Sequence, residues 1–213
     1  MMRFHGFFRS SSAYRCRIAL GLKGLEPEFV PVNLRAKEHR SEAYLALNPQ
    51  GLVPALETGE GVLFQSLAII EWLEETHPEP PLLPGDALGR ARVRGFAQII
   101  ACEVHPLQNL RVLNYLRASC GQDQEGCDLW CRHWIAEGLA ACEAIAAAES
   151  HGGAFTFGAR PGLADICLVP QMFSADRFGL DTGPYPRLRA IRDACEALPE
   201  FAAAHPARQS DAA

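Results

Sequence analysis

The chain has 213 residues, of which 48% are apolar and 21% are charged, and its formal net charge at pH 7 is −5. This length suffices for one large domain or two small ones. The negative charge argues against general binding to nucleic acid or to an anionic membrane surface, and no apolar run reaches the ~18 residues that a membrane helix needs. Any anion site must therefore be a local cluster of basic side chains on an acidic protein.

The cysteines and the N-terminal residues bear on the cellular compartment. The first residues, with Arg3 and His5 among them, lack the apolar core of a signal peptide, and none of the eight cysteines belongs to a Cys-x-x-Cys pair. We therefore expect a cytoplasmic protein with reduced thiols. Cys127 and Cys131 lie one helical turn apart with His133 nearby, but no second ligand pair follows at the spacing of a zinc site, so we expect no metal centre.

The first part of the chain alternates strand and helix signals. Alternating and short apolar runs predict four strands, at residues 2–8, 29–34, 53–57 and 62–64. Amphipathic patterns predict three helices, at residues 12–24, 41–47 and 66–76. The order strand, helix, strand, helix, strand, strand, helix predicts an α/β domain.

A proline-rich boundary follows at residues 78–84, where four prolines prevent regular structure. Beyond it the patterns are almost entirely helical. Helices are expected at residues 87–104, 106–117, 126–148, 163–178, 185–194 and 199–204, and a loose tail at 207–213. We therefore predict two domains, an α/β domain at 1–83 and an all-α helical domain at 84–213.

Three serines begin the first predicted helix, directly after the first strand. Ser10, Ser11 and Ser12 follow Arg9, and Arg15 lies one turn further on. Unpaired N–H groups at a helix N-terminus, the helix dipole, hydroxyl donors and positive side chains together form an anion site. The plain alternative is N-capping, for which serine is a favoured residue.

Five motifs, in order along the chain, resemble those of the cytosolic glutathione transferases, and in particular of the zeta class, which includes maleylacetoacetate and maleylpyruvate isomerases. They are residues 9–17 (RSSSAYRCR), 47–54 (LNPQGLVP), 65–71 (QSLAIIE), 105–110 (HPLQNL) and 163–171 (LADICLVPQ). The resemblance covers essentially the whole chain. It implies a thioredoxin-like, glutathione-binding domain at 1–83, a helical substrate-binding domain at 84–213, and a homodimer.

The resemblance also implies where glutathione binds in the first domain. Val53 and Pro54 match the family's cis-proline turn, which would leave the Val53 N–H and C=O free to pair with the extended tripeptide; an ordinary edge-strand proline is the alternative. Gln65 and Ser66 would hold the γ-glutamyl end at a helix start, and simple N-capping is the alternative. His39, in a charged loop, would contact the glycyl carboxylate unless it is merely solvated.

The reaction implied by the family is cis–trans isomerisation of a double bond conjugated to a ketone. Ser10 and Ser11 would stabilise the glutathione thiolate, with Ser12 among the cofactor contacts. The family usually has cysteine at the position of Ser12, and its absence favours the maleylpyruvate isomerases. The substrate is a small dicarboxylate, for which Arg9 is the first candidate anchor.

Further site residues are expected in the second domain. Glu103 and His105 would approach the γ-glutamyl group from the neighbouring subunit of a dimer, although His105 also suits a polar helix end. Asn109, Arg111 and Arg177 would bind the ketone and carboxylates of the substrate.

Other polar residues are expected to have structural roles. Arg15 and Arg17, further along the first helix, would form structural ion pairs. Asp165 matches the family's N-capping box on a buried helix, but the usual hydroxyl residue is replaced by Gly162, so only half of the box is present.

Two other functions stay open on the sequence alone. A glutathione transferase of this class would use the same thiolate and arginines on α-haloacids or other electrophiles. A non-enzymatic binding protein with this fold would be favoured by loss of the serine triplet or of Gln65–Ser66, and both motifs are present.

Overall fold

A four-stranded sheet organises the N-terminal part of the chain. The computed structural model describes residues 1–149 and 152–212. Strand β1 (Arg3–Gly6) pairs in parallel with β2 (Glu28–Pro31) and antiparallel with β3 (Ala55–Glu57), which in turn pairs antiparallel with β4 (Val62–Phe64). The strand order β2-β1-β3-β4, with one parallel and two antiparallel pairs, confirms the expected thioredoxin-like topology.

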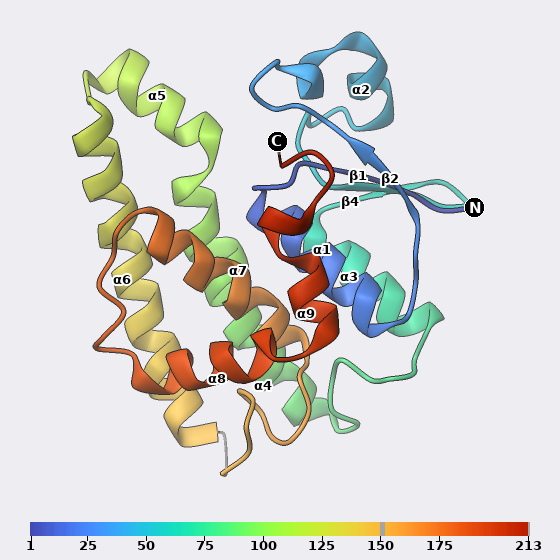
Figure 1. The fold of residues 1–213 in the computed structure, drawn as a ribbon, viewed down its shortest axis with the longest axis vertical. Helices are drawn as coiled ribbons and strands as arrows, with labels where there is room; N and C mark the ends of the chain where they lie inside the picture. Colours follow the sequence, from blue (N-terminus) through green and yellow to red (C-terminus); the bar gives the residue numbers. More distant parts are fainter. Residues whose placement is uncertain (150–151, 213) are drawn as a thin grey trace. The chain divides into compact units, whose positions relative to one another are not determined.

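Helices cover both faces of this sheet. Helix α1 (Ser11–Leu22) and helix α3 (Ser66–Thr76) pack together on one face, and α2 (Glu42–Leu47), preceded by the 3-10 turn η1 (Glu38–Arg40), lies on the other (Figure 1). The main core is formed by apolar side chains that are at most 2% exposed, among them Phe4, Ile18, Leu56, Ile69 and Leu73. A smaller cluster beside α2 contains Phe7, Val32, Tyr44 and Val53.

The C-terminal segment returns to this sheet domain. Helix α9 (Pro199–Ala204) packs against α1, and Phe201 is fully buried there. The 3-10 turn η4 (Pro206–Arg208) follows, and the Asp211 carboxylate accepts a hydrogen bond of 2.9 Å from the Phe8 N–H. The prediction of a loose tail at 207–213 is therefore wrong for residues 207–212, because tertiary hydrogen bonds order them.

The described residues divide into two compact units. Unit 1 comprises Met1–Pro81 with Leu198–Ala213, and unit 2 comprises Leu82–Ala197. These units differ from the domains expected at 1–83 and 84–213 chiefly in the place of the C-terminal segment.

Unit 2 is helical around one buried helix. Its main helices are α4 (Ala87–Gln98), α5 (Leu110–Cys120), α6 (Gln124–Glu149), α7 (Leu163–Arg177) and α8 (Pro186–Glu196). Helix α7 is buried on all sides from Leu163 to Met172, as expected for a helix whose apolar residues surround its axis. Helices α5 and α6 run side by side, joined by a short turn (Figure 1).

The helix predicted at 87–104 is wrong beyond Gln98. The chain continues as a π-helical segment, η2 (Ile99–Val104), and then a 3-10 segment, η3 (His105–Gln108), before α5 begins at Leu110. Gly138 of α6 allows this segment to approach, because a Cβ there would overlap the Val104 side chain. Such π segments occur often at functional sites.

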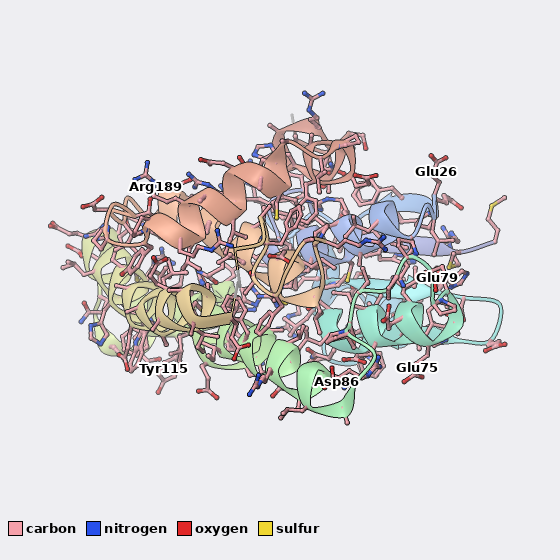
Figure 2. All side chains as sticks on the ribbon, turned by 90° about the horizontal axis from the view of Figure 1, so that it is seen from below. Glu26, Glu75, Glu79, Asp86, Tyr115 and Arg189 are labelled. Carbon is pink, nitrogen blue, oxygen red and sulfur yellow. The ribbon has the colours of Figure 1, made fainter. Side chains whose placement is uncertain are left out.

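Surface side chains agree with an acidic protein. Glu26, Glu75 and Glu79 of unit 1 are exposed, as is Asp86 at the start of α4 (Figure 2). None of the described helices is long and apolar enough to cross a membrane.

Candidate active site

The three serines lie at the start of α1, as the sequence suggested, and Ser10 also caps the helix. Ser10 is the N-cap, and its Oγ accepts a hydrogen bond of 3.3 Å from the Ala13 N–H. The same Oγ lies 3.2 Å from the Ser12 Oγ. The N-capping interpretation is thus confirmed for Ser10, and the cap uses an oxygen lone pair of Ser10 and not its hydroxyl proton. Ser11, the first residue of the helix, is buried.

Ser12 joins this turn to the loop before β3. The Val53–Pro54 peptide bond is cis, as expected. The Ser12 hydroxyl donates to the Val53 carbonyl at 3.2 Å. The sequence had suggested that this carbonyl would be free, and it is not. The Val53 N–H makes no hydrogen bond in the part of the chain that the structure describes. One backbone donor therefore remains for an extended ligand.

The start of α3 forms a second group of donors. Gln65 has a positive φ of 72°, an uncommon conformation for a residue with a side chain, and it directs the chain into the helix. Its Nε2 donates to the Gln50 Oε1 at 2.6 Å. Ser66 is buried at the first position of the helix, where N–H groups lack intrahelical partners. Gln50 was not among the predicted site residues.

Within residues 1–149 and 152–212, Arg15 and Arg17 do not form the predicted ion pairs. Arg15 is 1% exposed, and its Nη1 lies 3.4 Å from the Ser66 Oγ. Arg17 donates to two backbone carbonyls, those of Phe8 at 2.9 Å and Ala204 at 3.0 Å. Burial lowers the pKa of Arg17 to about 10. Its role is to join α1 to the chain on either side.

His39 lies on the turn η1, against the loop that contains Gly51. Gly51 has a φ of 60°, and a Cβ there would come within 2.9 Å of the His39 carbonyl. The His39 Nδ1 is buried and has no hydrogen-bond partner among the described residues. Burial, and then the nearby Arg40, lower the pKa of His39 below its usual value. The imidazole is therefore neutral at pH 7 and can donate one hydrogen bond.

Arg9 forms part of a positive cluster that the sequence did not reveal. Arg9 has no ion pair in the described part of the chain. Partial burial, and then the positive charge of Arg35, lower its pKa. Arg35 lies over the Phe8 ring, 5.9 Å from its centre. Two arginines of like charge side by side favour a bound anion.

In unit 2, Asn109 and Arg111 begin α5. Asn109 is the N-cap of this helix, and its Oδ1 accepts a hydrogen bond of 3.2 Å from the Arg111 N–H. The amide nitrogen of Asn109 is not needed for capping. The Arg111 side chain is exposed. One side chain therefore caps the helix and can still donate to a ligand.

The other predicted residues of unit 2 lie on two elements. Arg177 ends α7, with its guanidinium 4.5 Å from the centre of the Phe178 ring. Glu103 is exposed on η2, and the half-buried His105 begins η3.

A buried amide pair joins two of these elements and was not predicted. Gln108, directly before Asn109, donates from Nε2 to the Oε1 of Gln171 on α7 at 2.7 Å. Gln171 is fully buried and Gln108 is 6% exposed. The pair fixes the start of α5 to α7 within unit 2.

Asp165 caps α7, as predicted. Gly162, with no side chain, cannot complete the box, but its N–H donates to the Asp165 Oδ2 at 2.9 Å. Thr156 supplies the missing hydroxyl from another loop, donating to Oδ1 from its Oγ1 at 2.7 Å and from its N–H at 2.9 Å.

The cysteines are all free thiols, and most are buried. Burial raises the pKa values of Cys131 and Cys142 to about 12, so neither is a nucleophile at pH 7. Among the described residues, no three or more histidine, cysteine, aspartate or glutamate side chains are grouped as metal ligands.

Comparison with known proteins agrees with this geometry. Residues 4–81 match the family described as glutathione S-transferase, N-terminal domain. The chain is 50% identical to a maleylpyruvate isomerase from a Ralstonia species over 212 residues, which cover 100% of both chains. It is 51% identical over 213 residues to a maleylacetoacetate isomerase from Pseudomonas aeruginosa, covering 99% of this chain and 98% of the relative.

Solved structures give the same result. The holo structure of a maleyl pyruvate isomerase, a bacterial glutathione S-transferase in the zeta class, matches with a TM-score of 0.97 at 50% identity, covering 99% of this chain and 100% of that one. A maleylacetoacetate isomerase from Anaeromyxobacter dehalogenans with bound GSH in its active site matches with a TM-score of 0.90 at 47% identity, covering 100% and 98%. The chain therefore belongs to the zeta class of the glutathione transferases, the family of the maleylacetoacetate and maleylpyruvate isomerases.

Proposed function

We propose that this protein is a glutathione-dependent cis–trans isomerase that converts a maleyl keto diacid, maleylpyruvate or maleylacetoacetate, to its fumaryl isomer in the breakdown of aromatic compounds. The observation that carries the proposal is the first turn of α1, where the Ser10 hydroxyl lies at the helix N-terminus directly after Arg9, which has no ion pair among the described residues. Identity of about half the residues to isomerases over the full chain length supports it. In this proposal unit 1 binds glutathione and one carboxylate of the substrate, and unit 2 contributes further substrate contacts.

Unit 1 has donors suited to each part of glutathione. The Val53 N–H makes no hydrogen bond to the described residues and can pair with the cysteinyl backbone, as an added strand would. Ser66 and the N–H groups at the start of α3 suit the γ-glutamyl carboxylate, with Gln65 beside them. The neutral His39, whose Nδ1 has no partner among the described residues, suits the glycyl end.

The first turn of α1 activates the thiol. Ser10 can rotate its hydroxyl proton toward a sulfur anion while its lone pairs keep the Ala13 cap, and Ser11 lies next in the same turn. Hydrogen bonds and the positive end of the helix dipole stabilise the thiolate, which lowers its pKa. Ser12 is held by Val53 and so fixes the distance between the α1 turn and the cis-proline loop.

Bound glutathione supplies a thiolate that adds to the conjugated double bond, allows rotation about the resulting single bond, and is expelled again. Arg9, with Arg35 beside it, binds a carboxylate of the substrate. Asn109, Arg111 and Arg177 provide further donors for the second carboxylate and for the keto oxygen, on which negative charge develops.

The assembly and location complete the proposal. Glu103 and His105 would reach the γ-glutamyl group of the cofactor bound to a partner subunit, which requires a homodimer. Phe64, on the edge strand β4 and 45% exposed, is consistent with such a partner. A cytoplasmic location fits the supply of glutathione and the eight free thiols.

The test is the ultraviolet absorbance change of maleylpyruvate, and separately of maleylacetoacetate, with purified protein in the presence and absence of glutathione. We expect conversion only with glutathione, and a loss of at least about 100-fold in kcat/KM in Ser10→Ala or Arg9→Ala. Arg189→Ala serves as the matched control, because Arg189 is an exposed arginine of α8 without a role in the proposal (Figure 2). Measurable glutathione binding with no conversion of either substrate would refute the isomerase and favour a transferase acting on α-haloacids.

A further inference from the structure

Arg15 is a buried cation without a protein anion. The residue is 1% exposed and belongs to α1, which packs against α3. The Nη1 atom lies 3.4 Å from the Ser66 Oγ, and the Nε and Nη2 atoms are buried without hydrogen-bond partners among the described residues. Among the residues that the structure describes, no carboxylate lies within ion-pair distance of the Arg15 guanidinium.

This arrangement is energetically unfavourable for the protein alone. An unpaired charge in a protein interior loses several kcal/mol of hydration free energy, and an unsatisfied buried donor adds to that loss. Arg17, on the same helix, is better satisfied, because its Nε and Nη2 donate to two carbonyl oxygens and only its Nη1 is buried without a partner among the described residues. Arg15 has only a weak contact to one hydroxyl, so its charge is available to an anion from outside the chain.

The position of Arg15 identifies where that anion binds. Ser66 is the first residue of α3, a helix of 11 residues, and is itself 6% exposed. The Arg15 guanidinium and the Ser66 hydroxyl therefore lie together at the positive end of the α3 dipole. A positive charge beneath a helix N-terminus strengthens the attraction for an anion placed on its N–H groups.

We propose that Arg15 is a positioning residue for the γ-glutamyl α-carboxylate of glutathione, acting through Ser66 from beneath α3. This inference rests on the proposed use of glutathione. The guanidinium holds the Ser66 hydroxyl by donating to its oxygen, which leaves the hydroxyl proton directed to the carboxylate. Its charge also favours that carboxylate over any neutral group, so Arg15 makes the site selective for the intact γ-glutamyl end.

The experiment compares two ligands that differ only in this carboxylate. The dissociation constants of glutathione and of 4-aminobutanoyl-cysteinylglycine, which lacks the α-carboxylate, are measured by calorimetry for the wild-type protein, Arg15→Met, Arg15→Gln and Arg15→Lys. In both neutral variants we expect glutathione to bind about tenfold more weakly and the analogue to change less than about twofold. Arg15→Lys, which retains the charge, should recover most of the discrimination between the two ligands.

Arg17→Met is the matched control, since it removes a buried arginine from the same helix. It should lower the thermal unfolding midpoint while the ratio of the two dissociation constants stays at the wild-type value. The inference would be overturned if the ratio of the two dissociation constants in Arg15→Met and Arg15→Gln equals that of the wild type, whether or not both ligands bind more weakly. Arg15 would then have a purely structural role. Wild-type protein that does not bind glutathione would instead refute the proposed function, and the inference with it.

Discussion

Replacement of Asp165 by asparagine is expected to lower stability strongly and to leave catalysis unchanged. The carboxylate accepts three hydrogen bonds, two on Oδ1 from Thr156 and one on Oδ2 from the Gly162 N–H. An asparagine side chain could keep the two bonds from Thr156, but its amide nitrogen would then face the Gly162 N–H, donor against donor. One buried donor would remain unsatisfied, at a cost of about 1–3 kcal/mol.

The charge itself is subject to two opposing effects. Asp165 is the third residue of α7, where the helix dipole stabilises a negative charge, but burial raises the pKa of this carboxyl and so opposes ionisation. The free energy of unfolding should therefore fall by about 1–3 kcal/mol, the cost of the unsatisfied donor. For a chain of this length that corresponds to a decrease of about 2–12 °C in the unfolding midpoint.

The assay is thermal unfolding followed by circular dichroism, with kcat/KM for maleylpyruvate measured well below the transition. Asp193→Asn is the control, because the Asp193 side chain is 73% exposed and its loss should change stability by less than about 0.5 kcal/mol. A change of less than about 1 kcal/mol in Asp165→Asn would refute the reasoning. So would a loss of kcat/KM in folded protein, since it would give Asp165 a part in the reaction.

Three other outcomes are expected. The hydrogen bond from His5, and then other local effects, hold the pKa of Glu57 below its usual value of 4.5. The ionised Glu57 carboxylate therefore stabilises the folded protein above pH 4.5, and this contribution is lost on acidification. The urea midpoint of Glu57→Gln should consequently fall less steeply below pH 4.5 than that of the wild type. Gly138→Ala should destabilise the protein by about 1–3 kcal/mol despite the better helix propensity of alanine, because its methyl group overlaps Val104; an unchanged urea midpoint would contradict this packing. Cys102 and Cys120 are exposed and the other six cysteines are buried. Native protein should therefore react rapidly with a thiol reagent at these two cysteines, and the other six should react only after unfolding.

Local sequence signals predicted most elements of unit 1. The bounds of β4 and α3 agree to the residue with those expected at 62–64 and 66–76, because a hairpin turn and a serine at the helix start fix them. The cis bond before Pro54 was expected from the family motif and is confirmed. The capping role of Ser10 followed from its place between strand and helix.

The failures share a physical cause, since each depends on residues distant in the chain. The π-helical turn at Ile99–Val104 keeps the apolar pattern of an α-helix, and only its contact with Gly138 distinguishes it. The order of residues 207–212 depends on Asp211 and on a backbone N–H that lies 203 residues away in the chain. The sequence does not show that Arg15 is buried or that Arg35 lies near Arg9, because neither position has a signal that distinguishes it from a solvated arginine.

The candidate site was predicted unevenly for the same reason. Two residues from separate motifs of unit 1 meet, because the Ser12 hydroxyl donates to the Val53 carbonyl, and Ser66 of a third motif contacts Arg15. The Gln108–Gln171 pair joins residues from two separate motifs, and neither motif alone indicates the contact. Periodicity shows which face of a helix is buried but not which buried polar groups meet.

The return of α9 to α1 has a consequence for synthesis of the protein. Unit 1 is not continuous in sequence, because all of unit 2 lies between Pro81 and Leu198. At about 5–20 residues per second, a ribosome needs on the order of 10 s after completing the sheet to produce Phe201, which covers α1. During that interval the nascent sheet exposes an apolar patch on α1, so the proposed glutathione-binding unit is completed only after all of unit 2 has been made.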